Sequence, residues 1–87
     1  MTYKVLISEP VEKEINKYLN KELLRRLHKR IEKLKAFPDV YGKPLRGPLA
    51  GIWEIRFEVK YRILYVIDYP KKLVTIIGFK HKDEMAK

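Results

Sequence analysis

The chain has 87 residues, 46% hydrophobic and 36% charged, a balance typical of one small folded domain and not of a disordered chain. It contains no cysteine, which excludes disulfide bonds, thiolate nucleophiles and cysteine-ligated zinc. Twenty Lys and Arg against eleven Asp and Glu give a net charge of +9, which favours a polyanionic partner, with nucleic acid as the leading candidate. An acidic protein, an anionic membrane surface and a basic surface that only confers solubility remain alternatives.

No stretch reaches the length of a membrane span, and residues 1–10 lack the apolar core of a signal peptide. We therefore expect a cytoplasmic protein that makes no use of a membrane.

Residues 3–8 alternate as a short strand, and the first helix is predicted to follow over residues 9–19. Ser8 is its candidate cap, with Pro10 in the first turn. Asn20 is the candidate cap of a second helix over residues 21–36. Its apolar stripe consists of Leu24, Leu27, Ile31 and Leu34. Residues 37–51 are rich in Pro and Gly and are predicted to form a loop.

Residues 52–59 and 61–68 alternate with period two and predict a hairpin that turns near residues 58–60. Trp53, Ile55, Phe57 and Val59 are expected on the core face of the first run. Residues 73–79 are apolar on both faces, which indicates an interior strand. The predicted fold is α+β, a single domain over residues 1–87 in the order β-α-α-β-β-β. An antiparallel sheet carries a two-helix hairpin on one face, and the first strand joins an edge that the sequence does not fix.

Basic residues are expected to converge on the sheet face opposite the helices: Arg56, Arg62, Lys80, His81 and Lys82. Metal-free cleavage of a phosphodiester needs fixed positive charge at the phosphate, which arginines supply, and proton transfer, which a histidine can supply. The alternatives are ordinary ones. Arg62 can pair with Glu54 or Glu58 across the hairpin, and His81 can be a surface histidine. His28 is far from His81 in the sequence, so we expect no metal site.

The pattern resembles the RelE/ParE superfamily of bacterial and archaeal toxins over most of the chain. One stretch that carries the resemblance contains Pro44, Leu45, Gly47, Pro48, Leu49, Gly51, Trp53 and Arg56. The second contains Tyr61, Arg62, Ile63, Leu64 and Tyr65, and the closing pair is His81 and Lys82. The resemblance is more specific for the superfamily than for any branch within it.

The resemblance implies the toxin of a type II toxin–antitoxin system. RelE-like members are ribosome-dependent mRNA endonucleases, which promote attack of an mRNA 2′-hydroxyl on the adjacent phosphate in the A site, without a metal or other cofactor. The resemblance maps the scissile-phosphate arginine onto Arg62, a second arginine onto Arg56 and late basic residues onto Lys80 and Lys82. In the YoeB-like branch a histidine transfers protons, and His81 matches it. The implied partners are a cognate antitoxin protein, the ribosome and mRNA.

Further basic residues are expected to contact RNA: Arg26, Lys29, Lys43, Arg46, Lys60 and Lys82. Three features depart from the family pattern. Ala86 or Lys82 stands where many members carry a terminal tyrosine, the YoeB-like glutamate is absent between Pro44 and Leu45, and Trp53 and Ile55 replace strand lysines. Two alternatives therefore stay open: a ParE-like inhibitor of DNA gyrase, and a weakly active member that works only with its antitoxin.

Overall fold

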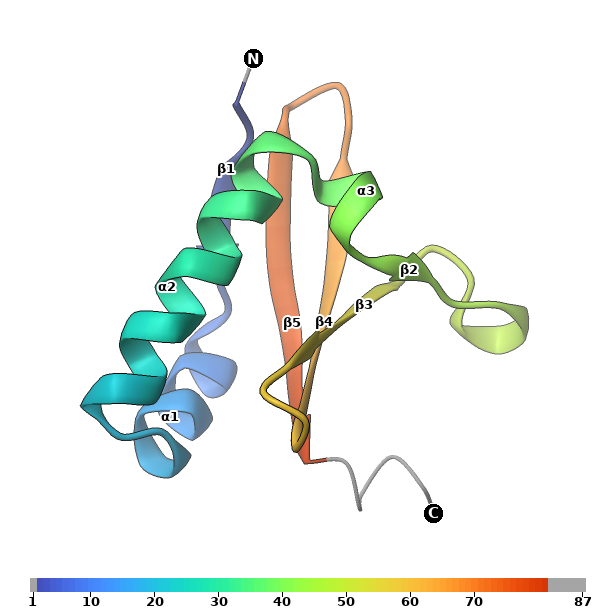
Figure 1. Cartoon of the computed structure of the whole chain (residues 1–87). Helices are drawn as coiled ribbons and strands as arrows, with labels where there is room; N and C mark the ends of the chain where they lie inside the picture. The colour runs from blue at the N-terminus through green and yellow to red at the C-terminus, as the bar shows by residue number, and fades with distance from the viewer. Residues whose placement is uncertain (1, 82–87) are drawn as a thin grey trace.

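The computed structural model describes residues 2–81, which form a five-stranded sheet with two long helices on one face (Figure 1). The expected α+β class is confirmed, as is the order of the long helices and longer strands. The elements are β1 (Lys4–Ile7), α1 (Glu9–Tyr18), α2 (Lys21–Ala36), α3 (Pro38–Tyr41), β2 (Lys43–Pro44), a 3-10 turn (Gly47–Leu49), β3 (Trp53–Phe57), β4 (Tyr61–Asp68) and β5 (Leu73–His81).

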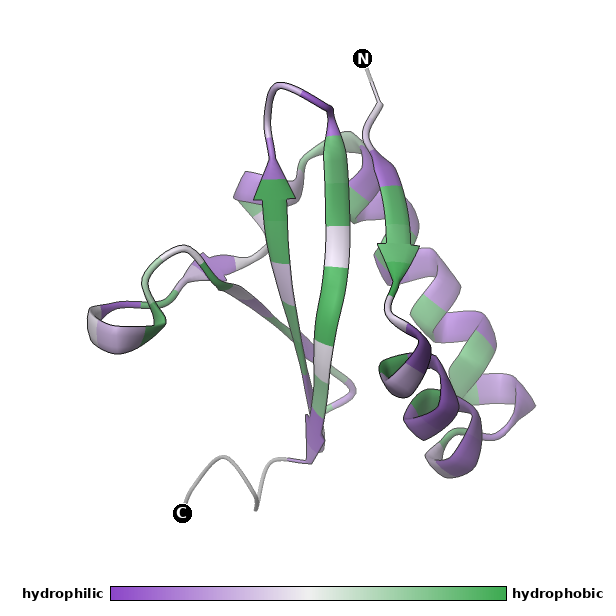
Figure 2. Ribbon diagram, turned by 180° about the vertical axis from the view of Figure 1, so that it is seen from behind, coloured by the Kyte–Doolittle hydropathy of each residue, from purple (hydrophilic) through white to green (hydrophobic). Residues whose placement is uncertain are grey.

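The long helices pack on the sheet because each carries an apolar stripe at three- and four-residue spacing. The buried residues of these stripes are Val11 and Ile15 in α1 and Leu27, Ile31 and Leu34 in α2. They form one core with the inward side chains of the strands, among them Phe57, Ile63 and Ile76. Figure 2 shows the opposite side, where β4, β5 and β1 lie side by side without a helix over them. None of the helices in residues 2–81 has the length and apolar character to cross a membrane.

The two helix starts differ in how they are capped. The Oδ1 atom of Asn20 accepts a hydrogen bond from the Leu23 N–H at 2.9 Å, which confirms the predicted cap of α2. Ser8 occupies the N-cap position of α1 but makes no side-chain cap bond. Its carbonyl accepts the Glu12 N–H at 2.9 Å, so Ser8 is the predicted N-cap but caps without a side-chain bond.

The strand order is β1-β5-β4-β3-β2, and β5 is interior as predicted. Strand β1 joins the far edge of β5 in parallel, with Lys4 opposite Leu73, whereas β5, β4, β3 and β2 are antiparallel neighbours. The sheet is therefore mixed, where we expected an antiparallel one. The parallel pair needs a long crossover, and α1 and α2 begin it.

Residues 37–51 are more regular than the predicted loop. They contain the one-turn helix α3, the two-residue strand β2 and the 3-10 turn. In β2, Lys43 lies opposite Glu54 and Pro44 lies opposite Trp53. The Pro and Gly content of this segment predicts a loop and does not reveal so short a strand pairing. The pairing brings Lys43 to the outer edge of β3.

The hairpin between β3 and β4 turns where predicted, but β3 ends at Phe57. Val59 is therefore in the turn with 79% of its surface exposed, and the expectation that it faces the core is wrong. Glu58 and Val59 have φ values of 58° and 55°. This left-handed conformation is rare for a β-branched residue such as Val59.

Tyr65 joins the sheet to α3. Its side chain is fully buried, and its hydroxyl donates a hydrogen bond to the Pro38 carbonyl at 2.6 Å. Burial raises the pKa of this hydroxyl, which keeps it protonated and able to donate. Gly42 lies directly against the same ring, where a Cβ would overlap the Tyr65 hydroxyl. The path of the segment from α3 to β2 thus depends on Tyr65.

We predict that Tyr65→Phe lowers the free energy of unfolding by about 1–3 kcal/mol, because the Pro38 carbonyl is left buried without its donor. Urea denaturation checks this. Tyr69→Phe is the matched control, since Tyr69 is 46% exposed. Above about pH 10 the unfolded tyrosine ionises while the folded one resists, so wild-type stability falls and its advantage over Tyr65→Phe shrinks. Equal stability of all three proteins at pH 7 would contradict the assigned role.

Candidate nucleic-acid interface

Three of the predicted site residues form a row across the sheet. Arg56 of β3 lies directly opposite Arg62 of β4, and Arg62 lies directly opposite Lys80 of β5. Because their neighbours Ile55, Ile63 and Phe79 are buried on the helix side, the three cations point to the other face. The predicted convergence of Arg56, Arg62 and Lys80 is confirmed. We call these three residues the cation row.

Arg62 is held at the centre of the cation row by Glu54. Its Nη1 atom donates to Glu54 Oε1 at 2.6 Å, and the two side chains are only 21% and 14% exposed. The pairing that we kept as an alternative for Arg62 is thus present. The Nε atom of Arg62 is buried and has no hydrogen-bond partner within residues 2–81. Arg62 therefore has guanidinium donors that the bond to Glu54 does not use.

A hollow of about 290 Å³ opens beside this ion pair. Its lining includes four cations, Arg30, Lys43, Arg56 and Arg62, together with Tyr41, Ile55 and Glu54. Within residues 2–81, Arg30, Lys43 and Arg56 make no salt bridge. An excess of cations over one carboxylate in a concave site attracts an anion. The residue types match phosphate, which guanidinium groups bind through paired donors.

Arg30 and Tyr41 reach this hollow from α2 and α3, and they were not among the predicted site residues. They are distant in sequence from the strands, and only the packing of α2 and α3 beside β3 brings them close. The signal that could have found Arg30 is its position among the basic residues of α2, but nothing local distinguishes it from its neighbours.

His81 does not join the cation row. Strand β5 extends to His81, two residues beyond the predicted end, so Lys80 and His81 point to opposite faces. The His81 ring lies edge-on to Tyr61 at 5.7 Å and lines a small cavity with Glu14, Tyr18 and Phe79 on the helix side. The expectation that His81 shares a face with Arg62 is wrong, and its part in proton transfer stays a prediction.

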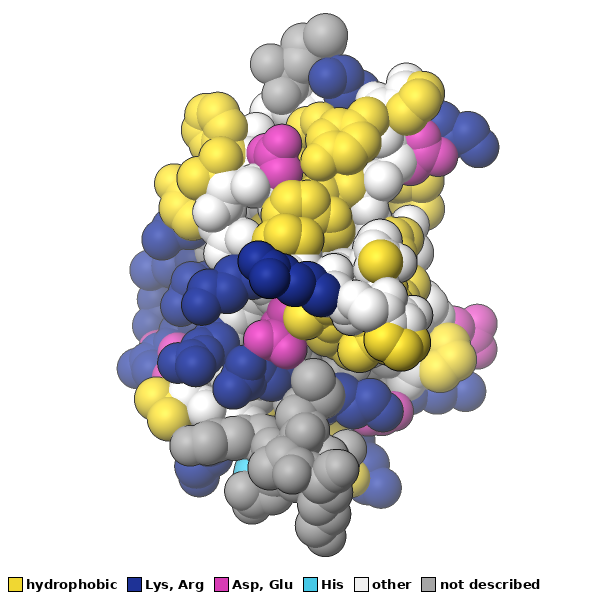
Figure 3. All heavy atoms as spheres, turned by 90° about the vertical axis from the view of Figure 1, so that its right-hand side faces the viewer, with side chains coloured by type: hydrophobic (Ala, Val, Ile, Leu, Met, Phe, Trp, Pro, Cys, Tyr) yellow, Lys and Arg dark blue, Asp and Glu magenta, His cyan; other side chains and the backbone are white. Residues whose placement is uncertain are grey.

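The predicted RNA-contacting residues occupy several elements. Lys29 of α2, Lys43 of β2, Arg46 before the 3-10 turn and Lys60 of the hairpin turn are all exposed. Lys82 lies outside the described residues. In Figure 3, Lys and Arg side chains gather in a band across the face on the β2 side, with a few carboxylates among them. The structure thus presents a broad basic surface on this side of the molecule.

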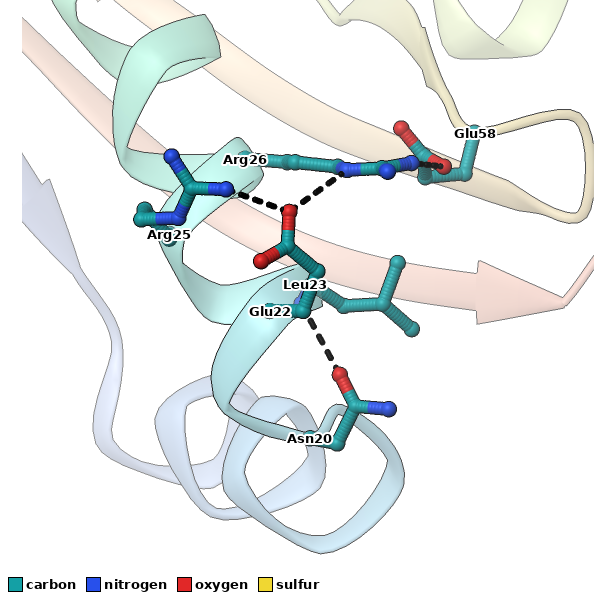
Figure 4. A network of polar contacts seen from close by, with 6 residues as sticks. All are labelled: Asn20, Glu22, Leu23, Arg25, Arg26 and Glu58. Carbon is teal, nitrogen blue, oxygen red and sulfur yellow. Dashed lines mark hydrogen bonds and ion pairs between the residues drawn. The ribbon is translucent and has the colours of Figure 1, made fainter.

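Arg26 is engaged in a different way from the others. It donates to Glu22 at 3.2 Å and to Glu58 at 2.8 Å, while Arg25 donates to Glu22 at 2.6 Å (Figure 4). Hydrogen bonds from Arg25 and then Arg26 lower the pKa of Glu22. Arg26 therefore links the start of α2 to the hairpin turn, a structural role in place of the predicted contact with RNA alone.

Within residues 2–81, no cluster of three or more His, Asp or Glu side chains is arranged to hold a metal ion. What the described site offers chemically is positive charge on a shaped surface, with Tyr41 beside it.

Comparison with known proteins gives a family and a fold. The model of the family described as ParE toxin of type II toxin-antitoxin system, parDE, matches residues 6–86. The chain is similar to a chain of the RelBE2 toxin–antitoxin complex of Mycobacterium tuberculosis, with 29% identity, a TM-score of 0.82, and coverage of 94% of this chain and 100% of that one. No curated protein sequence matches with significance.

Two further solved structures have a similar fold. The archaeal RelE–RelB complex of Pyrococcus horikoshii has a chain with 25% identity and a TM-score of 0.76, covering 94% of this chain and 97% of that one. A double mutant of the Escherichia coli toxin RelE in the free state has 26% identity and a TM-score of 0.77, covering 99% and 88%.

We predict that Arg56→Gln, Arg62→Gln and Lys80→Gln each weaken binding of a short single-stranded RNA. Each should reduce the steepness of log K against log salt by about 0.7, the contribution of one phosphate contact on a single strand. Fluorescence anisotropy across a salt series measures both quantities. Lys13→Gln is the control, because Lys13 is 76% exposed on α1 and pairs with Glu9. An equal loss in all four variants would mean that net charge alone matters.

Proposed function

Because the chain belongs to the ParE toxin family of type II toxin–antitoxin systems, we propose that this toxin is an endoribonuclease that cleaves mRNA in the ribosomal A site. The observation that carries the proposal is the cation row beside the hollow. Blocking an enzyme by protein contact alone does not require three cations to face one another across a sheet. Stabilising a phosphate as charge develops on it needs positive groups fixed in one place, and the cation row supplies them.

The proposed reaction is attack by an mRNA 2′-hydroxyl on the adjacent phosphorus. A new bond forms between that oxygen and phosphorus, the bond to the 5′-oxygen breaks, and the proton lost by the 2′-hydroxyl is balanced by one gained at the leaving oxygen. Arg62 and Arg56 hold the phosphate, and Lys80 adds charge beside them. These roles need no metal.

Dependence on the ribosome fits what the site contains. The cation row supplies charge, and the described groups on its face include no histidine. The ribosome would hold the mRNA in a geometry in which the 2′-hydroxyl faces the phosphate, and such positioning supplies a large share of the rate. The exposed basic residues Lys29, Lys43 and Arg46 would dock on ribosomal RNA. Free RNA would then be cleaved poorly.

A cognate antitoxin is the proposed protein partner. The similar structures from Mycobacterium tuberculosis and Pyrococcus horikoshii are toxin–antitoxin complexes. An antitoxin with an acidic segment would complement the net charge of +9 and cover the cation row.

We predict that the wild-type protein cleaves mRNA in the A site of programmed ribosomes and that Arg62→Ala does so about 10²–10³-fold more slowly, the usual cost of removing one group that stabilises transition-state charge. Primer extension on mRNA held in those ribosomes locates and quantifies the cut. Lys13→Gln should cleave like the wild type. Thermal unfolding of each variant separates lost chemistry from lost folding.

Inhibition of DNA gyrase is the second candidate, favoured by the name of the matching family. It predicts loss of gyrase supercoiling activity in the presence of the protein, with Arg62→Ala as inhibitory as the wild type. If neither protein cleaves mRNA on the ribosome and both inhibit gyrase, the nuclease proposal fails and the cation row is an interaction surface.

A further inference from the structure

The hollow beside the cation row contains one acid. Glu54 lines it together with Arg30, Lys43, Arg56 and Arg62, and its carboxylate bonds to the Arg62 guanidinium at 2.6 Å. Glu54 lies opposite Leu64, two residues along β3 from Arg56 and on the same face, so it reaches Arg62 diagonally across the ladder. An acid in the lining of a site that is otherwise suited to anions needs a reason.

We propose that Glu54 is a positioning residue for Arg62, and that it fixes the guanidinium at the expense of binding the anionic ligand less tightly. The part of this inference that concerns turnover rests on the proposed function. The ligand class, a phosphate group, rests on the hollow alone.

The first half of the proposal, that Glu54 positions Arg62, follows from the hydrogen bonds; we call it the positioning half. Glu54 engages Nη1, and Nε is buried without a partner within residues 2–81. A charged hydrogen bond is about twice as strong as a neutral one, so Glu54 keeps Arg62 in this partly buried place although Nε gains nothing there. Without Glu54 the side chain would gain by turning Nε toward water. The guanidinium has five N–H donors, so donors remain for a phosphate while Glu54 occupies Nη1.

The second half of the proposal, that the Glu54 carboxylate weakens binding of an anion, follows from charge; we call it the competing half. Glu54 is only 14% exposed, so solvent screens it poorly from an anion in the same hollow. A phosphate at Arg62 and Arg56 therefore meets repulsion from Glu54. Glu54→Gln removes that repulsion and keeps an oxygen of the same shape.

The chain offers a matched control in Glu58. It lies on the same hairpin and is bonded to an arginine at 2.8 Å, but that arginine is Arg26 and Glu58 does not line the hollow. Glu58→Gln changes the net charge by the same amount, so any difference between the two variants reports the position of the carboxylate.

The first experiment measures binding of inorganic pyrophosphate and of a short all-2′-deoxy oligonucleotide, which cannot be cleaved by 2′-hydroxyl attack, by isothermal titration calorimetry. Glu54→Gln should bind each about tenfold more tightly, and Glu58→Gln less than about twofold more tightly. Equal tightening in both variants, or weaker binding by Glu54→Gln, would overturn the competing half. These measurements need no cleavage, so they stand apart from the proposed function.

The second experiment follows Arg62 directly. In ¹⁵N NMR of the whole chain, the Arg62 Nε–H should exchange slowly with water in the wild type and in Glu58→Gln, and at least about tenfold faster in Glu54→Gln, because a buried N–H is released when its side chain moves. Unchanged exchange would overturn the positioning half, whether or not the protein cleaves RNA.

On programmed ribosomes the two halves predict different kinetic changes. In Glu54→Gln, tighter binding should lower KM and the loss of positioning should lower kcat, while Glu58→Gln should change neither. A fall in kcat with unchanged KM would refute the competing half, and a fall in KM with unchanged kcat would refute the positioning half. If no protein cleaves, the proposed function fails, and the binding and exchange results still decide this inference.

Discussion

The pairing of β4 with β3 on one side and with β5 on the other determines where the cations of the site lie. Because Arg56, Arg62 and Lys80 are opposite one another in two antiparallel ladders, the backbone sets the spacing of their charges. The same two ladders place Ile55, Ile63 and Phe79 on the buried side, so a slip of one residue would exchange core and site. The apolar core therefore enforces the cation row.

That arrangement has an energetic cost. Like charges directly opposite on neighbouring strands repel, and a chain selected only for stability would place opposite charges there. The structure offsets the cost at one point, where Glu54 bonds to Arg62, and leaves Arg56 and Lys80 without an ion pair within residues 2–81. Unfavourable pairs of like charge are expected at the sites where a protein binds a ligand. The cation row is the clearest such case in the described chain.

Much of this was predictable from the sequence because it depends on local periodicity. Period-two alternation predicted that Arg56 and Arg62 would lie on the solvent side of a hairpin, and helical spacing predicted the bounds of α2. What could not be predicted depends on long-range packing or on strand ends. A strand that continued through His81, instead of ending two residues earlier, moved that histidine to the opposite face. The parallel docking of β1 and the approach of Arg30 and Tyr41 to β3 are set by the packing of distant segments.

Fold similarity leaves the branch of the family open, because the matching family is named for ParE while the similar structures include RelE toxins. Our proposal of a nuclease rests on the site instead. An inhibitor that works by occupying a protein surface gains little from a guanidinium held at 21% exposure by a carboxylate that is still more buried. Fixing a guanidinium before the ligand arrives lowers the entropy lost on binding, and this matters most when the ligand is a single phosphate that must be held in one place. The Arg62–Glu54 ion pair is therefore the reason that we propose chemistry at a phosphate in preference to contact with a broad protein surface.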